Sequence, residues 1–254
     1  MPLQRRDVEK KIVKFYSEIL EAVANSVAAV KPNYAFFAQY GFEGLKAMRT
    51  LIAAAKKKKL PVILDAKRGD IGKGSEAYSK EVFKVWKADA VTVSPYMGYD
   101  SVAPFINYCG SGKGTYVLVR TSNTGANDLQ RLGTETGRKL FMEVAAKVTQ
   151  WHREGVGAVV GATNTAELEK ITKFFAAAKN KIPLLIPGVG AQGGSAREVA
   201  AVLRKNGDDI KIHRINSSSG ISYAYERYGS RDYVAAAEKA VKELNMEIAR
   251  LARK

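Results

Sequence analysis

The sequence predicts an α/β protein of the (β/α)₈ TIM-barrel class, folded as a single domain over residues 1–254, with the first strand of the barrel missing or replaced. The first observation behind this prediction is a regular alternation of short β-rich runs with amphipathic segments, which is typical of parallel βαβ units. The second is that polar residues stand where the β-rich runs end, as they do on the active-site face of a barrel.

The elements follow one another without a linker or a low-complexity segment. An amphipathic helix is expected over residues 5–26, and no strand precedes it. Strands are expected over residues 26–33, 61–67, 89–95, 115–122, 157–163, 183–190 and 210–218, with helices between them over residues 44–59, 74–88, 135–155, 165–179 and 195–207. Most of the strand runs are continuously apolar, as in strands covered on both faces. The runs number seven, so the barrel either closes imperfectly or lacks its first strand.

The ends of these runs carry the polar residues that favour a barrel over a doubly wound sheet. They are Lys31, Asn33, Asp65, Lys67, Ser94, Thr121, Ser122, Asn123, Thr163, Ser217 and Ser218. In a barrel all strand ends converge on one face, whereas a doubly wound sheet brings together only the few ends at its switch point.

The composition is that of an ordinary globular protein, with 46% hydrophobic and 26% charged residues. Cys109 is the only cysteine, which excludes an intrachain disulfide and a Cys-rich zinc site and fits a reducing cytoplasm. The two histidines, His152 and His213, belong to no metal-binding motif and are interpreted as structural or surface residues. Without a signal-peptide pattern or an apolar run of about 18 residues, we expect a soluble, unsecreted protein with no membrane association.

The formal charge of +16 is the unusual bulk property. A strongly basic protein attracts polyanions such as nucleic acids, anionic membranes and phosphorylated metabolites. Lysine-rich helix surfaces, as in residues 53–60, explain the charge better than a nucleic-acid patch, because no aromatic residues interleave with that lysine run.

The stretch VILDAKRGDIGKG, residues 62–74, is the principal catalytic candidate. Residues two apart on a strand face the same side, so Asp65 and Lys67 are expected to point together into the barrel, with Asp70 in the following loop. Buried charges persist when their signs alternate, and Lys31 ends the neighbouring run. The pattern favours a catalytic charge array over a structural salt bridge.

The stretch PGVGAQGG, residues 187–194, is interpreted as a phosphate-binding loop built on Gly188, Gly190 and Gly193. A dinucleotide fingerprint is the weaker interpretation, because the next strand ends without an acidic residue for a ribose. A tight glycine-rich turn without a ligand stays open as an alternative. The stretch at 110–115 is not a P-loop, since Gly114 stands where Ser or Thr must follow Lys113.

Taken in order, the motifs AVKPNYAFF, VILDAKRGDIG, VTVSPYMGYDS, VLVRTSNTGANDLQ, VVGAT and IPGVGAQGG resemble the orotidine 5'-phosphate decarboxylase family, in the branch whose lysine strand contains KPN. The resemblance covers about residues 26–225. It implies a homodimeric barrel that converts orotidine monophosphate to uridine monophosphate, the last step of pyrimidine synthesis, without a metal or an organic cofactor.

The resemblance also implies roles for individual residues. Lys31, Asp65, Lys67 and Asp70 resemble the alternating Lys-Asp-Lys-Asp array of that family, in which Lys67 would deliver the proton and Asp70 would reach into the partner subunit's site. The substrate-binding residues would be Ser122 at the pyrimidine edge, Gln192 between base and phosphate, Gly188, Gly190 and Gly193 at the phosphate, and Ser75 at a ribose hydroxyl.

The sequence departs from the family pattern at three places. No Gly-Leu-Asp-Pro strand precedes Lys31, Gly74 stands where the family usually has Thr, and Ser219 stands where it usually has the phosphate-binding Arg. Losing an Arg–phosphate contact costs on the order of 1.5–3 kcal/mol, unless Arg214 or Arg227 substitutes for it.

Two further hypotheses stay open at the level of sequence. One is a related barrel that acts on another phosphorylated sugar or nucleotide, for which a Mg²⁺ requirement would be the sign. The other is a catalytically impaired barrel that persists as a binding or nucleic-acid-associated protein, for which salt-dependent RNA binding without turnover would be the sign.

Overall fold

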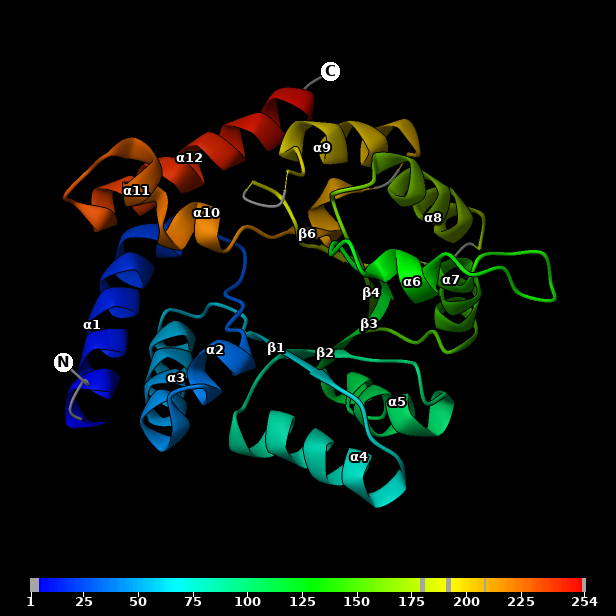
Figure 1. Cartoon of the computed structure of the whole chain (residues 1–254), viewed down its shortest axis with the longest axis horizontal. Helices are drawn as coiled ribbons and strands as arrows, with labels where there is room; N and C mark the ends of the chain where they lie inside the picture. The colour runs from blue at the N-terminus through cyan, green and yellow to red at the C-terminus, as the bar shows by residue number, and fades with distance from the viewer. Residues whose placement is uncertain (1–4, 179–180, 191–192, 208, 253–254) are drawn as a thin grey trace.

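The computed structural model describes residues 5–178, 181–190, 193–207 and 209–252. Six parallel strands form one sheet in the order β1-β2-β3-β4-β5-β6. They are β1 Ile63–Arg68, β2 Ala90–Val93, β3 Gly114–Arg120, β4 Val156–Val160, β5 Leu184–Ile186 and β6 Arg214–Ile215. The sheet curls into a half-barrel with helices around it (Figure 1). The predicted α/β class is confirmed, although the sheet of the described residues does not close into a complete barrel.

The helices connect the strands and cover the outside of the sheet. The α-helices are α1 Arg5–Val23, α2 Tyr34–Ala38, α3 Gly41–Lys57, α4 Gly72–Lys80, α5 Tyr99–Ile106, α6 Ala126–Gln130, α7 Leu140–Gln150, α8 Thr165–Ala177, α9 Ala196–Lys205, α10 Ser219–Ser222, α11 Ala224–Tyr228 and α12 Tyr233–Ala252. Short 3₁₀ or π turns are η1 Ala24–Ser26, η2 Glu81–Val85, η3 Cys109–Ser111 and η4 Ile210–Ile212. No helix in the described ranges is both long and apolar enough to cross a membrane.

The sheet buries its two faces differently. Alternate residues such as Leu64, Val91 and Val117 face the helices and join the main hydrophobic core. The residues between them form a small inner cluster of Ile63, Ala90, Val159 and Leu185, against which Ala29, Tyr116 and Leu118 pack. This alternation is the two-residue period of a strand, and it explains why strands covered on both faces lack polar positions along most of their length.

The segment over residues 26–33 differs from its prediction as a strand. Two isolated parallel bridges, Val30 to Val62 and Asn33 to Asp65, hold it beside β1. The Asp65 N–H donates to the Pro32 carbonyl at 2.9 Å, but proline has no N–H with which to continue the ladder. The segment therefore follows β1 in register and lies at the sheet edge without becoming a regular strand.

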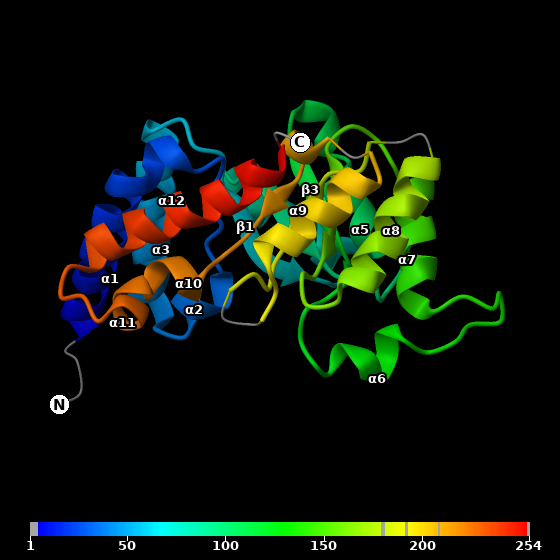
Figure 2. The same cartoon turned by 90° about the horizontal axis from the view of Figure 1, so that it is seen from above.

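The side of the half-barrel between this segment and β6 is partly covered by helices. In the described ranges no strand joins the 26–33 segment to β6 and closes the barrel. On this side α1 packs against α3 and α12. Figure 2 shows α1 and α3 at one end of the molecule and α7 and α8 toward the other, with α12 running from the first end to α9, which it contacts. The apolar face that a further strand would have covered is therefore partly covered by α1 and α12.

His213 precedes β6 and is a structural residue, as predicted. Its ring is buried, and its Nδ1 accepts a hydrogen bond from the Leu184 N–H at 3.0 Å. The Nε2 atom is buried without a partner among the described residues. Burial is the main cause that lowers the pKa of His213 from 6.5 to about 4, so the ring is neutral in the folded protein at pH 7.

We expect His213 to make the protein acid-sensitive. His213 binds a proton near pH 6.5 in the unfolded state but only near pH 4 in the folded state. Its contribution to the free energy of unfolding is therefore complete above pH 6.5 and falls as the pH decreases toward 4, by on the order of 3 kcal/mol. His213→Gln should flatten this part of the stability profile measured by urea unfolding. An unchanged slope between pH 6.5 and 4 in the variant would contradict the assignment.

Candidate active site

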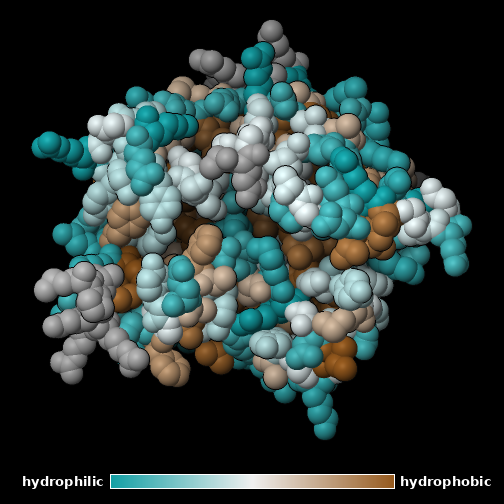
Figure 3. Space-filling model, viewed as in Figure 1, coloured by the Kyte–Doolittle hydropathy of each residue, from teal (hydrophilic) through white to brown (hydrophobic). Residues whose placement is uncertain are grey.

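A cavity of about 1190 Å³ opens at the carboxyl ends of the strands. One part of its lining is polar and includes Lys31, Asn33, Asp65, Lys67, Thr92, Thr121, Ser122, Asn123, Asn216, Ser217, Ser218 and Ser219. The other part is apolar, comes largely from α1 and the segment after it, and includes Phe15, Ile19, Leu20, Val23 and Val27. Figure 3 shows hydrophobic surface deep between the elements of this face. The volume exceeds the roughly 300–1,000 Å³ usual for small-molecule sites.

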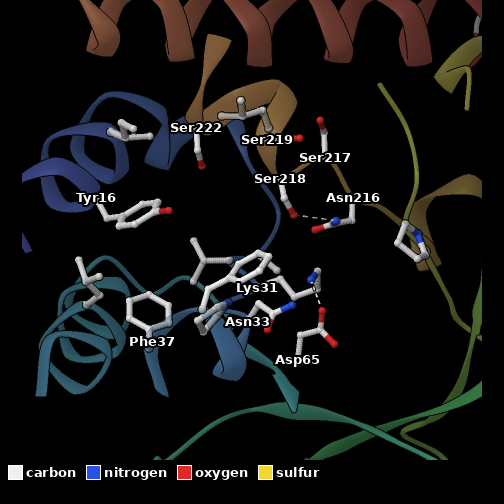
Figure 4. Close-up of a pocket in the computed structure, with 18 of the residues that line it drawn as sticks. Tyr16, Lys31, Asn33, Phe37, Asp65, Asn216, Ser217, Ser218, Ser219 and Ser222 are labelled. Carbon is white, nitrogen blue, oxygen red and sulfur yellow. Dashed lines mark hydrogen bonds and ion pairs between the residues drawn. The ribbon is translucent and has the colours of Figure 1, made fainter. Parts of the chain in front are cut away.

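The polar part is organised around the carboxylate of Asp65. Its Oδ2 atom accepts a hydrogen bond from the Lys31 Nζ at 2.5 Å, and its Oδ1 atom accepts one from the Lys67 Nζ at 2.6 Å. The Thr92 hydroxyl on β2 donates to the same Oδ1 at 3.0 Å. Figure 4 shows the Lys31–Asp65 pair within the cavity, opposite Asn216 and the serines that follow it. One carboxylate thus bridges two ammonium groups, as the sequence predicts.

The lysines differ in exposure. Asp65 and Lys31 each expose 9% of their side chains, whereas Lys67 exposes 49%. Burial would raise the pKa of Asp65, but the charges and hydrogen bonds of Lys31 and Lys67 outweigh it and hold the pKa below its usual range. Asp65 is therefore ionised at neutral pH, and the accessible Lys67 ammonium faces the cavity.

Lys67 has a backbone conformation that the sequence did not predict. Its φ of 46° lies in the left-handed region, and the register between β1 and β2 shifts between Leu64 and Arg68. The Lys67 N–H donates to the Thr92 hydroxyl at 3.0 Å. A non-glycine residue in this region costs on the order of 1–3 kcal/mol and is held by its surroundings. Here the Asp65 ion pair and Thr92 hold it.

Arg68, from the same motif, does not line the cavity. Its guanidinium forms hydrogen bonds with both carboxylate oxygens of Glu81 at 2.7–3.1 Å. It also lies 4.3 Å from the ring centroid of Tyr34 and 4.5 Å from that of Tyr78. Part of the charge in the motif therefore fastens the end of β1 to the helices around it.

Ser122, Thr121 and Asn123 line the cavity beyond the end of β3. A side chain at Gly161 would come within 2.8 Å of the Ser122 Cα, so the glycine allows β3 and β4 to approach closely at their ends. The Thr163 hydroxyl donates to the Ser122 carbonyl at 3.1 Å. The predicted pyrimidine contact Ser122 is thus on the cavity wall.

Asp70 and Ser75 are not in the lining of the cavity. The Asp70 carboxylate accepts a hydrogen bond from the Ile71 N–H at 2.8 Å, and a Cβ at Gly74 would collide with its Oδ2. Ser75 is completely buried and donates to the Ser101 carbonyl at 2.5 Å. This differs from the prediction that the Ser75 hydroxyl contacts a ribose, because α4 packs that hydroxyl against α5.

The glycine-rich loop after β5 is more closed than predicted. Gly188, Gly190 and Gly193 have φ values of 95°, 87° and 88°, which only glycine adopts readily. The Gly190 N–H donates to the Gly194 carbonyl and the Gly193 N–H to the Gly190 carbonyl, so these two donors are used within the loop. Gly188 lines the cavity, whereas Gly190 and Gly193 do not. The predicted residue Gln192 lies outside the described residues.

Residues 7–240 match the sequence profile of the Orotidine 5'-phosphate decarboxylase / HUMPS family. The chain belongs to this family. An orotidine 5'-phosphate decarboxylase of Verminephrobacter eiseniae is 45% identical over 221 residues, covering 85% of this chain and 77% of the relative. One of Delftia acidovorans is 42% identical over 246 residues, covering 94% and 84%.

Solved structures agree with this family assignment. Leishmania donovani OMP decarboxylase has a TM-score of 0.77 and 35% identity, covering 93% of this chain and 88% of that one. Leishmania donovani UMP synthase has a TM-score of 0.78 and 38% identity, covering 93% of this chain, which spans 50% of the UMP synthase. The predicted resemblance to the orotidine 5'-phosphate decarboxylase family is confirmed.

The position where the family usually has a phosphate-binding arginine is Ser219, the first residue of α10, and it lines the cavity. The two arginines considered as substitutes point elsewhere. Arg214 donates to the Lys211 and His213 carbonyls at 2.8 Å, and Arg227 pairs with Glu243 at 3.4 Å. Neither lines the cavity. The cations that do, among the described residues, are Lys11, Lys31 and Lys67.

Three residues of this decarboxylase-family site were not predicted from the sequence. Thr92 is the single polar residue of an apolar strand, and that interruption was the available signal. Asn216 donates to the Ser218 hydroxyl at 3.3 Å, and Tyr16 reaches the cavity from α1 (Figure 4). Burial, and then the neighbouring Tyr223, raise the pKa of Tyr16 to about 12. Tyr16 occupies an ordinary helix position, so the sequence carried no signal for it.

The described residues contain no group of three or more His, Cys, Asp and Glu side chains able to hold a metal ion. The polar side chains of the cavity are mainly ammonium, hydroxyl and amide groups, with Asp65 as the carboxylate at their centre. Such a donor set suits an anionic, hydroxylated ligand.

We expect Asp65→Asn to lower the free energy of unfolding by roughly 1–3 kcal/mol, because two ammonium groups lose their counter-ion. The pKa of Asp65 is depressed, so its contribution is complete above the unfolded value near 4 and is lost as the pH falls below it. The variant should therefore lose less stability than the wild type between pH 5 and 2 in urea titrations.

Asp89→Asn is the matched control. Asp89 also pairs with two lysines, Lys56 and Lys113, but it exposes 32% of its side chain and does not line the cavity. It should cost less stability than Asp65→Asn, because solvent screens a more exposed pair. Equal losses in the two variants would show that the Asp65 array has no special role in stability.

Proposed function

We propose that this protein decarboxylates orotidine 5'-monophosphate to uridine 5'-monophosphate in pyrimidine biosynthesis, without a metal or an organic cofactor. The observation that carries the proposal is the buried Asp65 carboxylate that bridges Lys31 and Lys67 within 2.6 Å in the lining of the cavity. In a chain of this family, such an array provides both a proton and a positive charge beside the reacting carbon.

Lys67 is the proposed proton donor. The bond between C6 and the carboxylate carbon breaks, carbon dioxide leaves, and the electron pair stays on C6. A proton from the Lys67 Nζ then forms the C6–H bond, and solvent returns a proton to the amine. The ammonium charge stabilises the developing carbanion before the proton is transferred. Asp65 keeps the lysine in place, and the 49% exposure of the Lys67 side chain leaves it accessible to a substrate.

The remaining contacts follow the proposed substrate. Lys31 and the partner's copy of Asp70 would complete the charge array and contact the ribose, Ser122 would bond the pyrimidine edge, and Gly188 would lie near the phosphate. Gln192 would bridge base and phosphate. The serines at 217–219 offer hydroxyl groups where the family usually has an arginine, so we expect weak phosphate binding and a high KM.

The proposal includes a homodimer that works in the cytoplasm. Large hydrophobic side chains are exposed in the loops after β1 and β2, with Ile71 at 60% and Tyr96 at 83% exposure. Asp70 precedes Ile71, in the same loop. Exposed apolar groups of this kind mark interaction sites. A second copy that covers this surface would bring Asp70 to the partner's cavity.

The first test is the loss of orotidine monophosphate absorbance on addition of purified protein, with EDTA present. We expect turnover by the wild type, and a loss of at least a hundredfold (about 10²) in kcat for Lys67→Ala, because its ammonium group is removed. Lys113→Ala removes a lysine outside the cavity and serves as the control. No turnover by the wild type at high substrate concentration would overturn the proposal, and activity that requires Mg²⁺ would favour another phosphorylated substrate.

The dimer is tested by mixing two inactive variants. In a heterodimer of Lys67→Ala and Asp70→Ala chains, one site combines an intact Lys67 with an intact Asp70 from the partner. Random exchange of subunits should therefore restore about a quarter of the wild-type activity. If mixing, confirmed by mass spectrometry of the heterodimer, restores nothing, then Asp70 does not act across the interface.

A further inference from the structure

Arg120, the last residue of β3, is a buried cation outside the cavity. It is 6% exposed, and it does not belong to the lining. A buried guanidinium persists only when its donors are satisfied. Its Nε donates to the Glu167 carboxylate at 2.6 Å, and its Nη2 donates to the Asn127 side chain at 2.8 Å. These partners lie on α8 and α6, so Arg120 ties two helices to the end of β3.

Arg120 and Gln130 together hold the next residue, Thr121. The Arg120 Nη1 donates to the Thr121 carbonyl at 3.1 Å and to the Gln130 Oε1 at 3.3 Å. The same Gln130 oxygen accepts the Thr121 N–H at 2.9 Å, and the Gln130 Nε2 donates to the Thr121 hydroxyl at 2.8 Å. Thr121 is thus held at its amide, its carbonyl and its side chain.

Thr121 is followed by Ser122 and Asn123, and all three line the cavity. The Thr121 hydroxyl also donates to Asn123 at 2.7 Å. The segment leads into α6, whose five residues are too few to be a stable helix without tertiary contacts. Figure 2 shows α6 projecting from the rest of the molecule. The position of this cavity wall therefore depends on the contacts of Arg120 and Gln130.

We propose that Arg120 is a positioning residue for substrate binding: it holds the 121–123 wall of the cavity at the place where the substrate base makes its contact. The inference rests on the proposed function for the identity of that substrate. The Arg120 side chain bonds Glu167, Thr121, Gln130 and Asn127. Lys31, Asp65 and Lys67 are instead fixed by each other and by Thr92. Loss of Arg120 therefore acts on binding and leaves the proton-transfer groups in place.

The test uses Arg120→Met, which keeps the length and apolar volume of the side chain but removes its donors. The KM for orotidine monophosphate should rise by about tenfold or more, with kcat within about threefold of the wild type. Arg120→Lys keeps the positive charge but has one ammonium group in place of the planar guanidinium, so its KM should lie between those of the wild type and Arg120→Met. Arg131→Met is the control, because Arg131 pairs with the same Glu167 at 2.6 Å but does not contact Thr121.

Amide hydrogen exchange, read by mass spectrometry on the full chain, separates positioning from general stability. Arg120→Met should exchange faster in residues 121–131, while β1, β2 and β5 keep their wild-type protection. Faster exchange throughout the chain, or a KM equal to that of the wild type, would overturn the proposal. Absence of turnover in the wild type would overturn the proposed function and the substrate part of this inference, whereas the exchange data would still decide whether Arg120 holds the loop.

Discussion

The site depends on one buried carboxylate. A single ionised group is costly to bury, and Asp65 is tolerated because two ammonium groups and a hydroxyl surround it. These partners come from the 26–33 segment, from β1 itself and from β2, which makes the carboxylate a meeting point of three adjacent stretches of backbone. The left-handed conformation of Lys67 and the register shift in β1 lie at the same place as this carboxylate and its two lysines.

The fold and the charge array could be predicted from sequence because both follow from local patterns. Continuous apolar runs that alternate with amphipathic segments specify a parallel sheet, and polar residues at strand ends specify one face of it. Lys31, Asp65 and Lys67 could be predicted on that basis. The strand predicted over residues 26–33 does not form as a regular strand. The cause is local, because Pro32 removes a donor from the ladder, but the result also depends on which strand lies beside the segment.

The rest of the site depends on packing that no local pattern records. The side chain of Ser75 turns into the α4–α5 contact, and the donors of Gly190 and Gly193 turn into their own loop. Tyr16 enters the cavity because α1 lies over the open side of the half-barrel. For Ser75 and Tyr16 the outcome is set by residues distant in sequence, so residue type and spacing could not decide it.

The open side of the half-barrel has a consequence for how copies of this chain behave in solution. The edge of a sheet is a template on which the strand of another molecule can pair, and such pairing leads to aggregation. Pro32 and the inward-pointing Lys31 make the 26–33 edge a poor template, and α1 and α12 cover part of the opening. The formal charge of +16 adds repulsion between molecules, which salt screens. Colloidal stability at low ionic strength is thus a property that the sheet edge and the surface lysines determine together.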